Sequence, residues 1–150
     1  MPVSELDQIL FDAAVDVLET MFFSAVMGDA PPPECKSSWI SARLSFHGSP
    51  SGSFGVGIPQ DCGRKIAAMF LGLEEESVTE LQIGEVVCEL TNMLCGSVLS
   101  RLENDTRFDL SHPELVPASS NCPEGASRVC RVLELEEGTL SVWLEMEPAL

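Results

Sequence analysis

Apolar side chains recur every three or four positions from Gly84 to Glu103, and this period predicts one long amphipathic helix. On a helix that turns about 100° per residue, the apolar side carries a set that should face a core: Val87, Leu90, Leu94 and Val98. The opposite side presents two carboxylates, an amide and a glycine in a sector roughly 60° wide: Glu85, Glu89, Asn92 and Gly96. Glycine costs about 1 kcal/mol inside a helix, so Gly96 indicates close approach of another backbone or molecule. The alternative is a solvated face with a tolerated glycine.

The beginning of the chain has the same helical period. Ser4 to Met27 carries a broad apolar stripe and predicts a helix, capped by Ser4 and Asp7 and ended by the proline run that follows Gly28. Aligned with the long helix, this segment places Val17 at the position of Glu89 and Thr20 at that of Asn92. We interpret the two helices as a degenerate internal repeat in which the first copy lacks the polar pair.

Strands are marked by a period of two. Ser38 to Phe46 alternates between apolar and polar residues, and Phe54 to Ile58 continues as the second strand of a hairpin. Val129 to Leu135 and Leu140 to Met146 predict a final hairpin around the Glu137-Gly138 turn. Phe108 to Val116 predicts a short strand or an extended segment. Trp39 and Trp143 fall on strand faces that we expect to point outward, where they mark a covered face, a subunit contact or edge packing.

Turn residues separate these segments. Pro59 to Gly72 begins with proline and ends with glycine, and it predicts a short helix. Leu73 to Thr79 is a polar connector, and we interpret its acidic run, Glu74 to Glu76, as a solvated turn. Thr79 and Gln82 have the spacing of a capping box for the long helix. Pro117 to Ser127 predicts a mobile loop.

This order of elements predicts the fold class. Runs of strands interrupted by helices favour an α+β domain, with an antiparallel sheet, two long helices on one face and a short connecting helix. A length of 150 residues suits a single domain, residues 1–150, with a substantial core.

The amino-acid composition limits the classes of partner that the chain can bind. The net charge is −16, from 24 Asp and Glu against eight Lys and Arg, which disfavours nucleic acids and anionic membrane surfaces. An acidic surface instead favours a basic patch or a cation. The N-terminus lacks the features of a signal peptide, and no run of 18 apolar residues predicts a membrane span, so we expect a cytoplasmic protein.

The sequence supports few other chemistries. No C-x-x-C pair occurs among the six cysteines, which we interpret as small apolar core residues rather than metal ligands. His47 and His112 lie in predicted loops and suggest no Ser-His-Asp or Cys-His set. The glycines between Gly52 and Gly57 fit neither nucleotide-binding fingerprint, because no Lys-Ser/Thr follows them.

Glu89-Leu-Thr-Asn92 resembles the E-x-x-N signature of the CheC/CheX/FliY family of bacterial chemotaxis phosphatases, and Met93 to Ser97 resembles the family's continuation. In that family an Asp or Ser precedes the Glu by four residues, where this chain has Glu85. A proline follows some twenty residues after the Asn, and Pro113 and Pro117 bracket that position. The first helix, with its Glu-Thr-Met run, is most similar to the CheX branch, whose fold covers nearly the whole chain.

The resemblance implies a phosphatase that hydrolyses the aspartyl phosphate of a CheY-type response-regulator receiver. By carry-over, Asn92 would orient the attacking water and Glu89 would pair with the receiver's active-site lysine. The Mg²⁺ would belong to the receiver, so the chain would need no cofactor or metal of its own. Glu85, Gly96 and Pro113 would play supporting parts, with Gly96 leaving room for the partner. The CheX branch also implies a homodimer.

Two other classes of function stay open. The chain could be a non-catalytic receiver-binding or flagellar-motor-type adaptor, an interpretation that the departure at Glu85 favours. A retained Asn92 favours catalysis, because a helix used only for docking does not need the amide. A structural dimerisation module would rest on sheet edges and exposed tryptophans alone.

Overall fold

The computed structural model describes residues 3–30, 39–48, 51–102, 107–117 and 128–146. The helices within these ranges are α1 (Val3–Met21), α2 (Gln60–Leu71), the short 3-10 helix η1 (Glu75–Ser77) and α3 (Glu80–Ser100). The strands are β1 (Val26–Asp29), β2 (Trp39–His47), β3 (Gly52–Pro59), β4 (Asp109–Leu110), β5 (Glu114–Val116), β6 (Arg128–Leu135) and β7 (Gly138–Met146).

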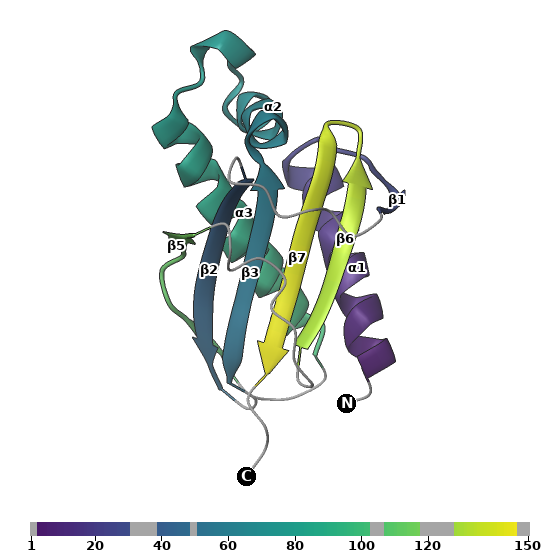
Figure 1. Cartoon of the computed structure of the whole chain (residues 1–150). Helices are drawn as coiled ribbons and strands as arrows, with labels where there is room; N and C mark the ends of the chain where they lie inside the picture. The colour runs from purple at the N-terminus through teal and green to yellow at the C-terminus, as the bar shows by residue number, and fades with distance from the viewer. Residues whose placement is uncertain (1–2, 31–38, 49–50, 103–106, 118–127, 147–150) are drawn as a thin grey trace.

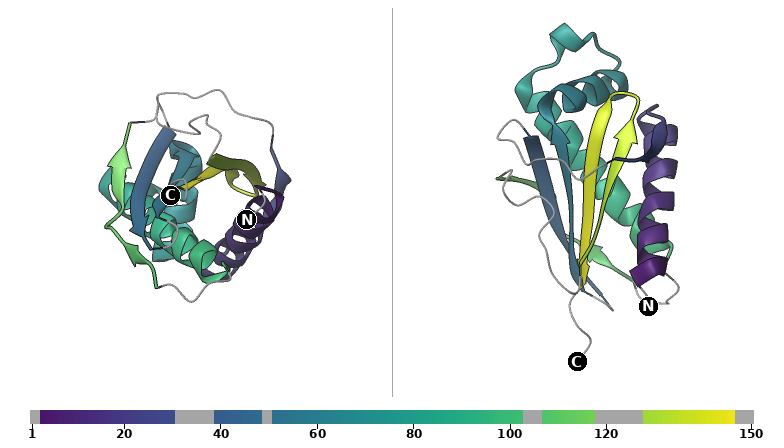
Figure 2. Two further views of the ribbon diagram at one scale, coloured as in Figure 1. Left: turned by 90° about the horizontal axis from the view of Figure 1, so that it is seen from below. Right: turned by 45° about the vertical axis from the view of Figure 1, so that its right-hand side comes forward.

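The seven strands form one antiparallel sheet in the order β1-β6-β7-β3-β2-β4, and β5 also pairs with β2. The two long helices, α1 and α3, lie side by side across one face of this sheet, and α2 lies at one end of it (Figure 1). Figure 2 shows the same two-layer arrangement from below and turned so that the right-hand side of Figure 1 comes forward. The predicted α+β class, with an antiparallel sheet and both long helices on one face, is confirmed.

The core lies between the sheet and the two long helices. The side of α3 that the periodicity predicts to be apolar faces this core, and its four residues are buried: Val87, Leu90, Leu94 and Val98. The alternating positions of β2 and β3 contribute the facing layer: Ala42, Leu44, Phe46, Phe54, Val56 and Ile58. By length and composition alone α3 would also pass for a membrane-spanning helix. Its apolar side is buried inside this fold, as in the core helix of a globular domain.

Helix α3 begins four residues before the predicted Gly84 and ends at Ser100 rather than Glu103, which lies outside the described residues. The predicted capping box is confirmed. The Gln82 N–H donates to Thr79 Oγ1 at 3.1 Å, and the Thr79 N–H donates to Gln82 Oε1 at 2.9 Å. Two donors that the first helical turn would leave unpaired are thereby satisfied, and the starting point of the helix is fixed.

Replacing Thr79 with alanine is expected to lower the free energy of unfolding by about 1 kcal/mol, because one cap acceptor is lost. Thr79→Ser keeps the hydroxyl and should unfold within about 0.5 kcal/mol of the wild type. Urea denaturation followed by circular dichroism measures both variants. Equal stability of the alanine and serine variants would show that the cap does not hold the helix.

The prediction for the end of the first helix is wrong. Helix α1 begins at Val3, so Ser4 lies inside it rather than at its cap, and the helix ends at Met21 instead of Met27. Phe23 adopts a left-handed backbone with φ 56°, and the Leu18 carbonyl accepts hydrogen bonds from the Phe22 and Ser24 N–H groups. Residues 26–29 then form β1. The proline run therefore comes too late to explain where the helix stops.

Strand β1 is held by a partner far along the chain. It pairs with β6, and Arg131 of β6 forms a bidentate ion pair with Asp29, with both oxygens 2.7 Å from Nη2. The same guanidinium lies 4.4 Å from the centroid of the Phe11 ring and 3.6 Å from the Asp7 carboxylate on α1. Such planar, charge-assisted contacts are stronger than neutral hydrogen bonds, so Arg131 joins α1, β1 and β6.

Trp143 lies on the sheet face opposite the core, as predicted, because its neighbours Val142 and Leu144 belong to the core cluster and it does not; of the alternatives, a covered face is the one observed. The Trp143 side chain is only 4% exposed, while Trp39 is half-buried. Trp143 lies over Gly55 of the paired strand β3, and a Cβ at Gly55 would come within 2.2 Å of the indole ring. The missing side chain on β3 thus makes the space that the indole fills, and Trp143 is covered within its own sheet face.

The cysteine prediction is confirmed in part. Cys62 and Cys95 are buried, and burial raises the pKa of each thiol to about 12, so both stay protonated and inert. Cys88 is half-buried, and burial raises its pKa as well. Cys130 is disulfide-bonded, so for this residue the interpretation is wrong. Cys35 and Cys122 lie outside the described residues.

Most of the predicted loop from Pro117 to Ser127 also lies outside the described residues. The segment from Phe108 to Val116 contains two short strands, β4 and β5, and both pair with β2. His47 is the last residue of β2 rather than part of a loop, His112 lies between β4 and β5, and both histidines are exposed.

Candidate functional site

The polar face of α3 is open to solvent. Glu85, Glu89 and Gly96 are exposed, and Asn92 is half-buried. A Cβ at Gly96 would meet no described atom within 4 Å, so the packing of this chain does not require the glycine. The face therefore combines two carboxylates and an amide with a bare stretch of helix against which another molecule can lie closely.

The rotation of α3 about its axis is fixed by the two residues inside the E-x-x-N signature. Leu90 and Thr91 are fully buried, and Thr91 Oγ1 donates a hydrogen bond of 2.7 Å to the Val87 carbonyl. Because these side chains lie in the core, Glu89 and Asn92 must project on the opposite side. The core thus presents the polar pair at a fixed angle, which a positioning role requires.

Within the described chain, the side chains of Glu85, Glu89 and Asn92 make no hydrogen bond or ion pair. The carboxylates and the amide keep their full capacity for an outside partner. By contrast, the C-terminal end of α3 is bound internally. Arg101 donates to Ser97 Oγ at 2.6 Å and lies 3.4 Å from Asp16 of α1, which anchors the helix beyond the polar face.

Strand β5 borders this face. Gly84 has no side chain, and a Cβ there would lie 2.9 Å from Leu115 Cδ1, so Leu115 of β5 lies directly against the helix. Pro113 precedes β5 and is half-buried, while Pro117 follows it and is exposed. Both candidate prolines therefore flank the strand that lies beside the N-terminal half of α3.

Two apolar neighbours of the site were not predicted from the sequence. Leu115 could not be found from the sequence, because only the pairing of β5 with β2 brings it to α3. Leu81 gave a usable signal. It lies four residues before Glu85, so the helical period places this leucine within the polar sector of the helix. In the structure its side chain is 73% exposed.

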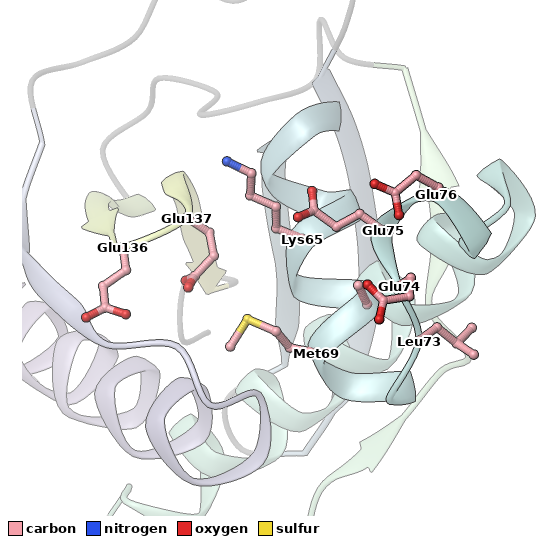
Figure 3. Close-up of a pocket in the computed structure, with 9 residues that line it drawn as sticks. Lys65, Met69, Leu73, Glu74, Glu75, Glu76, Glu136 and Glu137 are labelled. Carbon is pink, nitrogen blue, oxygen red and sulfur yellow. The ribbon is translucent and has the colours of Figure 1, made fainter.

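A hollow with a volume of about 580 Å³ lies away from the polar face of α3. Figure 3 shows the labelled residues that line it: Lys65, Met69, Leu73, Glu74, Glu75, Glu76, Glu136 and Glu137. The acidic run is exposed as predicted, but the fold brings it opposite the turn between β6 and β7. None of the described lining residues comes from α3, and in the described part of the chain no three His, Cys, Asp or Glu side chains converge as metal ligands. The face of α3 is the stronger candidate.

Residues 40–132 match the family model described as chemotaxis phosphatase CheX. The chain belongs to the CheX family. The match spans more than half of the sequence and includes the whole polar face of α3 together with β5. No curated protein matches the chain by sequence.

Solved structures of CheX and CheC-like proteins have the same fold. CheX from Vibrio vulnificus is 19% identical with a TM-score of 0.76, covering 98% of this chain and 99% of that chain. A CheC-like protein from Shewanella sp. PV-4 is 22% identical with a TM-score of 0.74, covering 99% of this chain and 100% of that chain. The CheX-CheY-BeF3-Mg+2 complex from Borrelia burgdorferi contains a chain 19% identical with a TM-score of 0.72, covering 94% and 97%. The CheC-like fold and the CheX branch are thus confirmed for this chain.

Proposed function

We propose that this CheX-family protein hydrolyses the aspartyl phosphate of a CheY-type receiver domain, with Asn92 and Glu89 as the working side chains. One observation carries the proposal. Glu89 and Asn92 project from the exposed face of α3, whose rotation is fixed by the core, and their side chains have no partner within the described chain. The Borrelia CheX-CheY-BeF3-Mg+2 complex supports a receiver of the CheY type as the partner.

The reaction needs an ordered water more than a reactive side chain. Water attacks phosphorus in line, the bond from phosphorus to the aspartyl oxygen breaks, and inorganic phosphate and a free carboxylate result. Asn92 would accept a hydrogen bond from this water through Oδ1 and donate toward a phosphoryl oxygen through Nδ2. An amide can make both hydrogen bonds without adding negative charge beside the phosphoryl group. A carboxylate would add that charge and has no N–H group to donate.

Glu89 would form an ion pair with the receiver's active-site lysine and so align Asn92. One turn earlier, Glu85 would support the position of the helix, and Gly96 would leave room for the partner's backbone. The Mg²⁺ would stay on the receiver, where it neutralises the phosphoryl oxygens. Under this proposal the chain supplies only docking and a water-positioning amide.

The decisive experiment uses receivers from the same genome, phosphorylated with a small-molecule phosphodonor and mixed with the wild-type protein. Release of inorganic phosphate is followed against the receiver's own spontaneous rate. We expect at least tenfold acceleration with one receiver. If no receiver is accelerated, the proposed function is wrong, whether or not one binds.

Glu89→Gln is expected to raise KM for the phosphorylated receiver by about 10- to 100-fold, because the neutral amide cannot form an ion pair with a lysine. Since Asn92 remains, kcat at saturating receiver should change much less. Steady-state phosphate release over a range of receiver concentrations measures both constants. The wild-type advantage should shrink at high salt, which screens exposed ion pairs.

Glu80→Gln is the matched control for this prediction. Glu80 is an exposed glutamate in the first turn of the same helix, and it projects away from the sector that holds Glu89. The control should behave as wild type. If both variants raise KM equally, the effect of Glu89 comes from net charge alone and the docking role is wrong.

The second candidate function is a receiver-binding adaptor without turnover. The observation that favours it is Glu85, which replaces the Asp or Ser found at this position in related phosphatases with a longer acidic side chain. An adaptor would bind the phosphorylated receiver and leave its lifetime unchanged. The same mixing experiment, with binding measured in parallel, separates the two functions.

A further inference from the structure

Two exposed leucines lie beside the polar face of α3. Leu81 on α3 is 73% exposed, the highest fraction among the large apolar side chains of the described chain, and Leu115 on β5 is 54% exposed. Single exposed leucines are common on protein surfaces. These two come from different elements, and both lie near Gly84 beside the candidate site, so their exposure needs a separate explanation.

Both leucines lie close to Gly84. Leu115 Cδ1 occupies the place that a side chain at Gly84 would need, and Leu81 lies one helical turn before Gly84 on the same side of α3. Cys88, half-buried, lies one turn after Gly84. Leu81, Leu115 and Cys88 form an apolar strip that we name the leucine ridge.

The core does not need these leucines. Both are absent from the buried cluster that fills the space between sheet and helices. Strand β5 is only three residues long, and its backbone pairing with β2, in which Leu115 faces Ala42, does not depend on which side chain Leu115 carries. A leucine exposed on such an edge contributes little to folding and much to any contact that covers it.

The ridge is continuous with the polar face. At about 100° per residue, Leu81 lies within roughly 40° of Glu85 and 20° of Asn92 on the helix. Carboxylates border it on both elements, Glu85 on α3 and Glu114 on β5, and both are exposed. The surface that fits is therefore an apolar patch bordered by lysine or arginine.

We propose that the leucine ridge is a docking anchor for the receiver domain, placed so that its occupation sets the register of Glu89 and Asn92 on the phosphorylated site. This inference rests on the proposed function for the identity of the partner. The commitment to a basic-rimmed receiver, rather than a second copy of this chain, comes from charge. In a symmetric contact between two ridges the acidic borders, Glu85 and Glu114, would face the same carboxylates of the copy, whereas a cationic rim would pair with them.

Leu81→Ala and Leu115→Ala test the ridge. Each should weaken binding to a beryllofluoride-activated receiver about tenfold, a change of about 1.4 kcal/mol. KM for dephosphorylation should rise by the same factor, and kcat at saturating receiver should stay within twofold. Leu73→Ala is the matched control, because Leu73 is 41% exposed at the hollow shown in Figure 3 and should leave binding unchanged.

Gly84→Ala tests the geometry without deleting a ridge side chain. The added methyl group would lie 2.9 Å from Leu115 Cδ1, so the Leu115 side chain must shift away from Gly84. Binding should weaken about fivefold, while the helix itself should not lose stability, since alanine is the better helix former. Thermal unfolding of every variant checks that the fold is intact.

The outcomes separate the two proposals. If the receiver binds but is not dephosphorylated, the proposed function fails, and the ridge stands or falls on whether Leu81→Ala weakens that binding. A change of less than twofold in both leucine variants overturns the ridge. So does a loss of self-association with receiver binding unchanged, which would make the ridge a contact between copies. If no receiver binds the wild type, both proposals are wrong.

Discussion

Asn92→Ala is expected to slow receiver dephosphorylation by about 100-fold or more, in the range found when one transition-state hydrogen-bonding group is removed. Receiver binding should remain within about threefold of wild type, because Glu89 and the leucine ridge still supply the docking contacts. The amide has no partner in the described chain, so its loss should cost function rather than stability. Single-turnover phosphate release at saturating receiver isolates the step.

Asn92→Asp separates the chemistry of the amide from its size. Aspartate fills the same volume but places a negative charge beside the phosphoryl group and removes the Nδ2 donor. We expect it to be as inactive as the alanine variant and to bind the phosphorylated receiver more weakly. If Asn92→Ala keeps more than about a third of the wild-type rate, the water-positioning role is wrong and the adaptor function gains support.

Leu90→Ala is expected to reduce the free energy of unfolding by about 3 kcal/mol, within the range of 2–5 kcal/mol for a buried leucine. Leu90 is 0% exposed and belongs to the cluster between the sheet and the long helices. The lost methyl groups leave a cavity that the rigid sheet and two packed helices cannot close. Urea denaturation measures the change in midpoint.

Glu89→Ala, one residue away, provides the contrast. Glu89 is exposed, so its truncation should change stability by less than about 0.5 kcal/mol while weakening receiver docking. Of these two adjacent residues, Leu90 would then determine the stability of the fold and Glu89 the affinity for the receiver. If both variants lose stability equally, α3 is not oriented as described.

Together these predictions describe α3 as a two-sided element. Its apolar side joins the sheet to α1, and its polar side carries the only arrangement in the described chain that combines exposed carboxylates, a free amide and a glycine without a packing role. Because the core fixes the rotation of the helix, the polar face needs no rearrangement before a partner binds. This arrangement suits the proposed role, in which one amide of α3 enters another protein's active site.

The sequence by itself determined the helical rotation that defines the site. A period near 3.6 placed Leu90 inward and Glu89 outward, and the Thr79 and Gln82 pair marked the cap, because both signals act within a few residues. The hairpins followed from alternation and turn residues for the same reason. Local patterns also led to the family, since Glu89 and Asn92 are close in sequence.

Only the tertiary structure decided which distant segments meet. The end of α1 depends on the pairing of β1 with β6, more than 100 residues later, and Trp143 is buried because Gly55 lies on the neighbouring strand. The leucine ridge depends on β5 reaching Gly84 of α3. Periodicity predicts whether a side chain faces an apolar or a polar environment. Which segment supplies that environment depends on the free energy of the whole packed sheet.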